Sequence, residues 1–311
     1  MANSENLTTF HGLKVVDFEL GESLPDPRTS AVRLAIRHDG EFDGLAEMWA
    51  EFLATDGVAE TSALVLGNWA NPEDGPEPSD PAVELLIASA DRLPKLTALF
   101  FGDITSEENE ISWIEQTDVS ALWGAYPNLE EFGIRGGTRL EFGRIKHAKL
   151  KTLRVEAGGL PRGVVQSVAH ADLPALEHLE LWLGTQNYGG DSRPEDLAGI
   201  LDGSHFPKLQ TLALRNCEWA DDLAAIVATA PIIKRIKRLD LSMGTLSDVG
   251  VDALAASPSI KGLKYIDVAH HYVSDAGIAK LSSLGITVDA KDRQKPDSYG
   301  GEEHRYIAVS E

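Results

Sequence analysis

Leu176-Glu177-His178-Leu179-Glu180-Leu181 holds leucine at its first, fourth and sixth positions, and the chain repeats this spacing at least seven times. Other large apolar residues replace leucine in some copies. The last two apolar residues of each copy alternate with exposed positions, as a short strand with one buried face requires, and the first anchors the turn that enters the strand. The other clear copies are Leu96-Leu99-Phe101, Leu129-Phe132-Ile134, Leu150-Leu153-Val155, Leu209-Leu212-Leu214, Ile236-Leu239-Leu241 and Leu263-Ile266-Val268.

The copies recur at intervals of 21 to 33 residues, which is the period of leucine-rich repeats. One strand-helix unit cannot enclose its own apolar face, so such units must stack into one continuous core. We therefore predict an α/β leucine-rich-repeat solenoid, or horseshoe, with a concave parallel β-sheet and helices on its convex side. Weaker copies at Leu64-Leu66 and Leu34-Ile36, and the alternating run Leu13-Val15-Phe18, extend the prediction over nearly the whole chain.

Most intervals between the copies have the apolar periodicity of a helix. Ser247-Asp248 and Ser274-Asp275 place side-chain acceptors where the first helical amides lack partners, and Pro194 suits a first turn. The predicted helices are Ala82 to Ser89, Gly163 to His170, Pro194 to Leu201, Asp222 to Thr229, Asp248 to Ala256 and Asp275 to Leu281.

The chain divides into three expected segments. Residues 1–60 are expected to hold N-terminal capping strands, a helix and a degenerate repeat, residues 61–289 the leucine-rich repeats, and residues 290–311 a polar C-terminal tail. Within that tail, Tyr306-Ile307-Ala308-Val309 is a candidate capping strand, because the open edge of a terminal repeat otherwise recruits another chain.

Two units, Thr245-Leu246-Ser247-Asp248-Val249-Gly250 and Tyr272-Val273-Ser274-Asp275-Ala276-Gly277, resemble the Leu-Ser/Thr-Asp-x-Gly segment of ribonuclease-inhibitor-like leucine-rich repeats. The wider chain, over most of residues 10–311, resembles an uncharacterised bacterial cytoplasmic leucine-rich-repeat family. That resemblance implies the horseshoe fold and a cytoplasmic location, and it lends no activity. It is carried by Leu99-Phe100-Phe101-Gly102-Asp103-Ile104, Glu110-Ile111-Ser112-Trp113-Ile114, Glu180-Leu181-Trp182-Leu183-Gly184 and Arg305-Tyr306-Ile307-Ala308-Val309.

The amino-acid composition restricts the expected cellular compartment and the classes of partner. The 49 acidic and 28 basic side chains give a formal charge of −21, which repels nucleic-acid backbones and anionic membrane surfaces. Cys217 is the only cysteine, so an internal disulfide or a cysteine-based zinc site cannot form. Residues 1–9 lack the basic start and apolar run of a secretory signal. We therefore expect a cytoplasmic protein that binds neither nucleic acid nor membrane.

The residues between the strand leucines are expected to line the concave surface in three columns. The first column runs Ala98, Glu131, Thr152, His178, Thr211, Arg238, Tyr265; the second Phe100, Gly133, Arg154, Glu180, Ala213, Asp240, Asp267; the third Gly102, Arg135, Glu156, Trp182, Arg215, Ser242, Ala269. Arginine and aromatic residues dominate interface energetics, so these columns indicate a binding surface. The predicted partner-binding residues are Arg135, Arg154, His178, Glu180, Trp182, Tyr188, Arg215, Arg238, Asp240, Tyr265 and Asp267.

A second interpretation of the same columns is equally weighted, namely that Arg and Glu on neighbouring strands, such as Arg154 and Glu180, only pair with each other. Insertions after three strands, at Asn68 to Pro81, Asp103 to Thr117 and Gly184 to Pro194, are expected to project from one rim. The last of these has the small polar and aromatic composition of a binding loop and carries Tyr188.

Metal and catalytic signals are weak. His270 and His271 are adjacent on an expected strand and so point to opposite faces, and His271, like Cys217, falls where repeats turn a side chain inward. The sequence predicts no catalytic residue, metal ligand or cofactor. The leading hypothesis is a scaffold or adaptor for a protein or peptide. The alternatives are a small-molecule sensor near Trp182 and Tyr188, or a metal-assisted hydrolase using Glu107, Glu108, Trp113 and His271.

Overall fold

The spaced leucines lie on strands that stack side by side in chain order. A computed structural model describes residues 5–37, 40, 42–71 and 75–311, without the side chain of Tyr299. Within these residues one sheet contains twelve strands, in the order β1 to β12. The strands are β1 Thr9–Phe10, β2 Leu13–Asp17, β3 Ser30–Leu34, β4 Ala63–Leu66, β5 Ala98–Phe101, β6 Glu131–Arg135, β7 Thr152–Glu156, β8 His178–Gly184, β9 Thr211–Cys217, β10 Arg238–Asp240, β11 Tyr265–Asp267 and β12 Thr287–Asp289.

The pairing register confirms the first two predicted columns. From β2 to β12 neighbouring strands are parallel, and the first column is paired from Ala98 on β5 to Tyr265 on β11. The second column is paired in the same way from Phe100 to Asp267. Since side chains along a strand alternate between faces, both columns lie on the side of the sheet away from the core. We call that side the open face.

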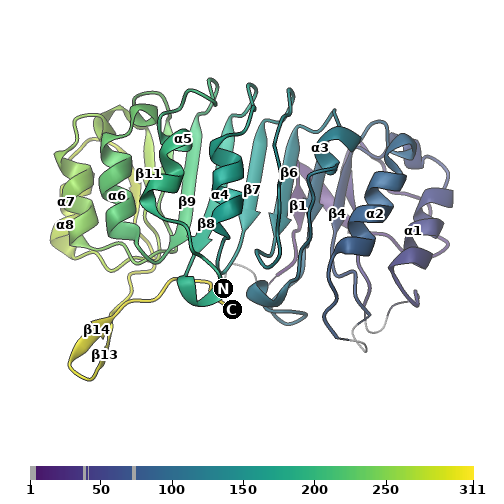
Figure 1. Cartoon of the computed structure of the whole chain (residues 1–311), viewed down its shortest axis with the longest axis horizontal. Coiled ribbons are helices and arrows are strands. Elements are labelled where there is room, and N and C mark those ends of the chain that lie inside the picture. The colour runs from purple at the N-terminus through teal and green to yellow at the C-terminus, as the bar shows by residue number, and fades with distance from the viewer. Residues whose placement is uncertain (1–4, 38–39, 41, 72–74) are drawn as a thin grey trace.

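The helices cover the other side of the sheet (Figure 1). Five of the six predicted helices are confirmed with boundaries shifted by at most two residues, and the sixth, predicted at Pro194 to Leu201, is a 3-10 turn followed by the short helix α5. Between β6 and β7 the spacing is 21 residues, and the described chain forms no helix there because so short a connection leaves no room for one. The helices are α1 Leu45–Ala54, α2 Asp80–Ala88, α3 Leu122–Ala125, α4 Arg162–Ala169, α5 Ala198–Leu201 with a 3-10 turn Pro194–Leu197 before it, α6 Ala220–Thr229, α7 Asp248–Ala256 and α8 Asp275–Ser282.

The strand leucines form one continuous core with the inner faces of these helices. The predicted inward positions are confirmed: Cys217 is buried and unpaired, and His271 is buried with its ring nitrogens bonded to the backbone of Val273 and Ala290. His147 does the same in an earlier repeat, contacting Tyr126 and Leu150. Inward side chains therefore satisfy loop amides and carbonyls that the sheet leaves without partners.

The Ser-Asp-x-Gly segments join neighbouring repeats. The Asp248 carboxylate at the start of α7 accepts the backbone N–H of Ser274, 2.8 Å away at the start of α8. Asp221 accepts from the backbone of Ser247 and Gly250 in the same manner. A Cβ at Gly277 would lie 2.4 Å from the Asp248 carboxylate, so glycine is required where the two repeats meet. The motif is thus a lateral helix cap.

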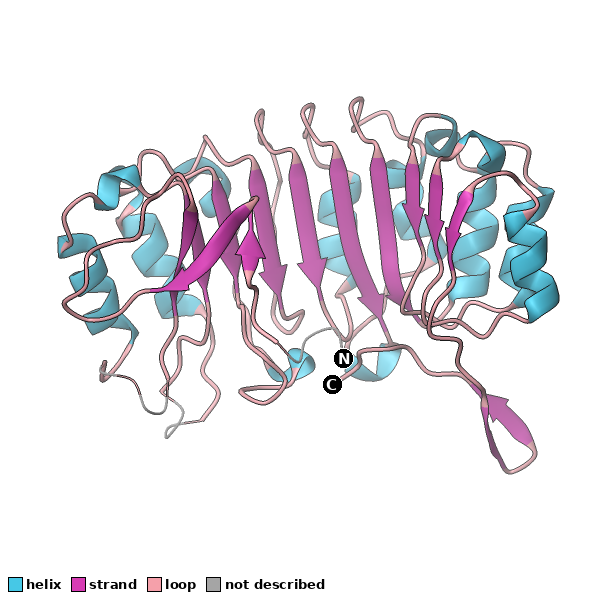
Figure 2. Ribbon diagram, turned by 180° about the vertical axis from the view of Figure 1, so that it is seen from behind, coloured by secondary structure: helices cyan, strands magenta, loops and turns pink. Residues whose placement is uncertain are grey.

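At the N-terminal end, β1 pairs antiparallel with β2 and folds over the open face. Phe10 packs edge-on against Phe100, with ring centroids 5.9 Å apart, and together with small apolar residues of β3, β4 and β5 they form a second core. Figure 2 shows the sheet from this side, with the N-terminal hairpin lying across part of it. The open face is therefore covered over its first strands and accessible over the later ones.

The candidate capping strand at Tyr306 to Val309 is not a strand. The sheet instead ends at β12, and the chain then forms a separate hairpin, β13 Asp297–Tyr299 paired with β14 Glu302–His304, which projects from the solenoid (Figure 1). Residues 305–311, which we call the returning segment, run back to Asn216, at the end of β9.

Within the part of the chain that the structure describes, no helix combines the length and apolar character needed to cross a membrane.

We expect Asp248→Ala to lower the free energy of unfolding by about 1–2 kcal/mol, because it removes a charged helix cap between two repeats. Asp252→Ala is the matched control on the same helix, since the Asp252 carboxylate is exposed and pairs only with Lys280 among the described residues. Its expected cost is below about 0.5 kcal/mol. Urea unfolding of both variants measures the difference, and equal costs would contradict the capping role.

Candidate binding surface

The accessible part of the open face spans β7 to β11. It presents Arg154, His178, Arg215, Asp240 and Asp267 as partly buried side chains, with Arg238 exposed. These residues come from consecutive strands whose register is fixed, so their spacing follows the sheet. The structure therefore brings together most of the predicted partner-binding residues.

Glu180 lies at the centre of this surface and is almost fully buried. One carboxylate oxygen accepts from Arg215 and from the Trp182 indole, each at 2.7 Å, and Arg154 lies 3.7 Å from it. The other oxygen is 3.4 Å from His178. Burial by itself would raise the pKa of Glu180, but the hydrogen bonds from His178 and Trp182 and the charges of the two arginines hold that pKa well below its usual value.

The charges on this surface are therefore largely paired with each other, as the second interpretation of the columns predicts. Arg154 also contacts Glu156, and Arg215 lies 3.5 Å from Asp240. Burial raises the pKa of Asp240, although the charge of Arg215 opposes this effect. The pairing fixes the orientation of the guanidinium groups, and about a third of Arg154 and a quarter of Arg215 stay accessible.

The C-terminal half of the surface holds an aromatic residue under a cation. The Arg238 guanidinium lies 4.1 Å from the centre of the Tyr265 ring. The Tyr265 hydroxyl donates to Asp267 at 3.2 Å, and burial together with the charge of Asp267 raises its pKa to about 12. Tyr265 is thereby held in one orientation, with Arg238 above it and exposed to solvent.

Two predicted residues, Arg135 and Trp182, are not on the accessible surface, since each is only 1% exposed. Arg135 bonds Glu156 at 2.7 Å and the Ile104 carbonyl. Trp182 is covered by Val309 of the returning segment. Arg135 and Trp182 lie at or near the ends of their strands, where a loop and the returning segment cover them, and the repeat pattern carries no information about that cover.

Tyr188 lies on the rim loop after β8, where its hydroxyl bonds Glu311. A residue that the sequence did not identify, His11, reaches across the sheet from the N-terminal hairpin and lies 2.8 Å from Glu131. That hydrogen bond raises the pKa of His11 against the opposing effect of burial. His11, Glu131 and His178 line a hollow of about 320 Å³ on the open face.

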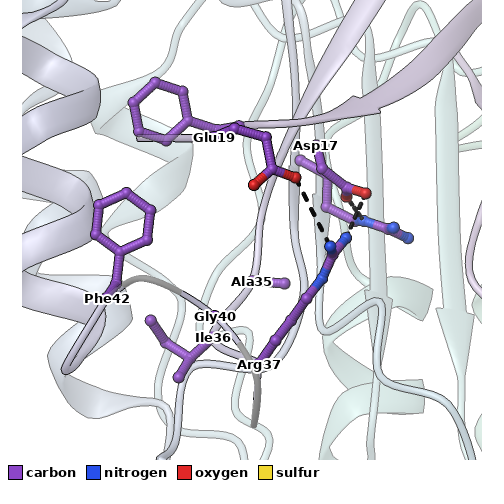
Figure 3. A pocket seen from close by; sticks show the side chains of 9 residues that line it. Asp17, Glu19, Ala35, Ile36, Arg37, Gly40 and Phe42 are labelled. Atoms are coloured by element: carbon purple, nitrogen blue, oxygen red, sulfur yellow. Dashed lines mark hydrogen bonds and ion pairs between the residues drawn. The ribbon is translucent and has the colours of Figure 1, made fainter. Parts of the chain in front are cut away.

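A separate pocket of about 310 Å³ lies at the N-terminal end, beside Phe18 and Phe42 (Figure 3). Its charged groups form ion pairs with each other: Arg33 is 2.5 Å from Asp17, and Arg37 contacts both Asp17 and Glu19. This pocket lies far from the Trp182 and Tyr188 region that the small-molecule hypothesis uses, because β2 and β8 are six strands apart.

The residues of the hydrolase alternative do not meet. Glu107 and Glu108 follow β5 and His271 follows β11, and six strand spacings separate them by about 29 Å. His271 is also buried and bonded to backbone. Among the described residues, no group of three or more His, Cys, Asp or Glu side chains is placed to hold a metal ion.

Comparison with known proteins supports the architecture. The crystal structure of a protein from Bacteroides fragilis is similar to this chain, with 28% sequence identity and a TM-score of 0.78 over 86% of this chain and 76% of that one. An internalin of Listeria monocytogenes matches with 11% identity and a TM-score of 0.45, over 86% and 69%, a likeness too low to support an inference. No protein-family model and no curated protein matches the chain. The repeat and the sheet together define a leucine-rich-repeat solenoid.

We expect Glu180→Gln to lower the free energy of unfolding by about 3 kcal/mol near neutral pH, because the partly buried guanidinium groups of Arg154 and Arg215 lose the buried carboxylate that they share. The pKa of Glu180 is lower in the folded than in the unfolded chain, where it is about 4.3. The unmutated protein therefore exceeds Glu180→Gln in free energy of unfolding by the full amount above that pH. The difference shrinks as the pH falls below it.

Urea unfolding at about pH 7 and about pH 3.5 measures this effect. Glu130→Gln is the control, since Glu130 pairs with Lys151 at 2.7 Å on the surface. A deficit in Glu180→Gln that is as small as that of the control would contradict the central role of Glu180.

Proposed function

We propose that this chain is a bacterial cytoplasmic scaffold or adaptor that binds a protein or peptide on the open face of β7 to β11. The observation that carries the proposal is the row Arg154, Arg215 and Arg238 with Tyr265, presented from four strands and already held by Glu180, Asp240 and Asp267. Side chains that are ordered before binding lose little conformational entropy when a partner arrives.

The charges on this surface favour a partner that carries both acidic and basic side chains. The accessible arginines alternate with Asp240, Asp267 and the nearby Asp289, so a segment that offers both carboxylates and basic groups complements it. A nucleic-acid backbone offers only negative charge and would meet a chain of net charge −21. The proposal includes no cofactor and no catalysis.

The proposal is tested with the Arg238→Glu variant. Arg238 is exposed, so folding is expected to tolerate the change. A partner bound on the open face would lose its contact with the Arg238 guanidinium, and Tyr265 would lose the cation that lies over its ring. We expect the affinity for that partner to fall by about ten-fold or more, which corresponds to at least about 1.4 kcal/mol.

Partners are captured from bacterial extract with the unmutated chain and ranked by quantitative mass spectrometry against two variants. Lys280→Glu is the matched control: it makes the same charge change on α8, on the far side of the sheet, where Lys280 is half exposed. Proteins that are lost with Arg238→Glu and kept with Lys280→Glu support the proposal. Equal recovery with both variants would exclude the open face as the binding surface.

A further inference from the structure

The rim at the ends of β8 to β10 holds an extended peptide, namely the returning segment of residues 305–311. Four parts of the solenoid form its groove: Ile111 after β5, Trp182 on β8, Asn216 on β9 and Met243 after β10. Trp182 and Asn216 belong to the paired strands β8 and β9, and Ile111 lies on a 3-10 turn of the loop after β5. The groove lies at the edge of the sheet and adjoins the open face of β7 to β11 through Trp182, whose indole donates to Glu180.

The solenoid forms hydrogen bonds with the backbone of the segment. The carboxamide of Asn216 accepts the N–H of Val309 at 3.1 Å and donates to the Val309 carbonyl. The N–H of Ala308 donates to the Met243 carbonyl at 2.9 Å, and the Ser112 hydroxyl donates to the Ser310 carbonyl at 2.5 Å. Backbone pairing of this kind gives affinity in peptide-recognition sites, while side-chain pockets give specificity.

Asn216 is 0% exposed, although asparagine is usually exposed. Its backbone has the positive φ of 54°, and its amide N–H is bonded to the Ser242 carbonyl, so its carboxamide is held at the groove. Within the described chain that carboxamide has one further partner, the Ala157 carbonyl at 3.3 Å. With the segment in place, this carboxamide bonds both the N–H and the carbonyl of Val309, so its donor and acceptor match one residue of an extended peptide.

Three side chains of the segment are recognised. Val309 is 3% exposed and fills the apolar pocket of Ile111, Trp182 and Met243. Arg305 bonds Asp221 at 3.0 Å and the Thr245 carbonyl at 2.7 Å. Glu311 accepts from the Tyr188 hydroxyl.

Tyr306, in contrast, is 59% exposed, and it is its backbone that bonds the Tyr272 hydroxyl and His270. Recognition therefore concentrates on a basic residue, a small aliphatic residue four positions later and an acid two positions after that.

The segment is connected to the solenoid through a hairpin that lies outside the main sheet. The β13–β14 hairpin that precedes it forms its own two-stranded sheet and projects from the solenoid (Figures 1 and 2). The segment has no secondary structure and contributes one side chain, Val309, to a buried cluster, with Ala308 partly buried beside it. Its attachment thus depends on the groove.

We propose that this groove is a peptide-binding site, filled in cis by the returning segment, and that it accepts an extended segment of a partner protein with the same chemistry: a basic residue, three residues, a small aliphatic residue, one residue and an acid. The site goes beyond the proposed function, because it lies on the rim and does not use Arg154, Arg215, Arg238 or Tyr265. The returning segment competes with the partner and limits access to the site.

The test uses a fluorescently labelled peptide of residues 305–311 and the chain shortened by the same residues. We expect saturable binding to the shortened chain and about 100-fold weaker binding to the full chain, because a tethered segment has an effective concentration in the millimolar range. The same peptide with Val309→Asp is expected not to bind. A shortened chain that keeps its circular dichroism spectrum and binds neither peptide, or both equally, would overturn the proposal.

A second pair of variants keeps the full chain, in case the shortened one does not fold. Val309→Asp is expected to release the segment and to raise the affinity for the unmutated peptide by about 100-fold relative to the full chain. Tyr306→Asp is the matched control, since it adds the same charge at an exposed side chain, and its affinity is expected to stay unchanged. Equal peptide affinity in both variants and the unmutated chain would contradict a displaceable segment.

Measuring the oligomeric state distinguishes a groove that binds a different protein from one that binds a second copy of this chain. We expect the full chain to stay monomeric at the concentrations used for peptide binding. Concentration-dependent dimers that require residues 305–311 would instead assign the groove to the segment of another copy and overturn the proposal of a different partner.

Discussion

The fold depends on one constraint, that a single repeat of 21 to 33 residues cannot bury its own leucines. Each unit must place its strand beside the next in a fixed register, because a shift by one residue would turn the leucines outward. The unbroken order from β2 to β12 is the consequence. The lateral caps from Asp221 and Asp248 add a polar link between the last helices. Like the leucines, they hold neighbouring repeats together.

The same constraint generates the candidate surface. Once the register is fixed, Arg154, Glu180 and Asp240 lie on one face at the spacing of the strands, whatever else the chain does. Their mutual pairing and their availability to a partner are not exclusive, because paired arginines keep part of their surface accessible. Pairing positions these groups, and the uncovered half of the sheet determines which of them a partner can reach.

The sequence predicted the features that repeat and missed those that do not. The strands, the columns and the inward Cys217 and His271 follow from a period that can be counted along the chain. The cover of Phe100 by Phe10 and of Trp182 by Val309 joins residues 90 and more positions apart, and no periodicity marks such contacts. Arg135 and Trp182 were therefore expected on a surface from which they are absent. Asn216 was missed because its backbone partners come from the returning segment, although its place next to Cys217 could have drawn attention to it.

The most direct test of the stacked register is disulfide formation between neighbouring strands. His178 and Thr211 are register partners on β8 and β9, about 4.8 Å apart, within the range of a disulfide, and the only native cysteine is buried. His178 and Arg238 lie two strands apart, at about 9.6 Å, which is beyond that range. We predict that the double variant His178→Cys, Thr211→Cys forms an internal disulfide under mild oxidation and that His178→Cys, Arg238→Cys does not. Equal cross-linking of both pairs, or of neither, would contradict the stacked parallel sheet.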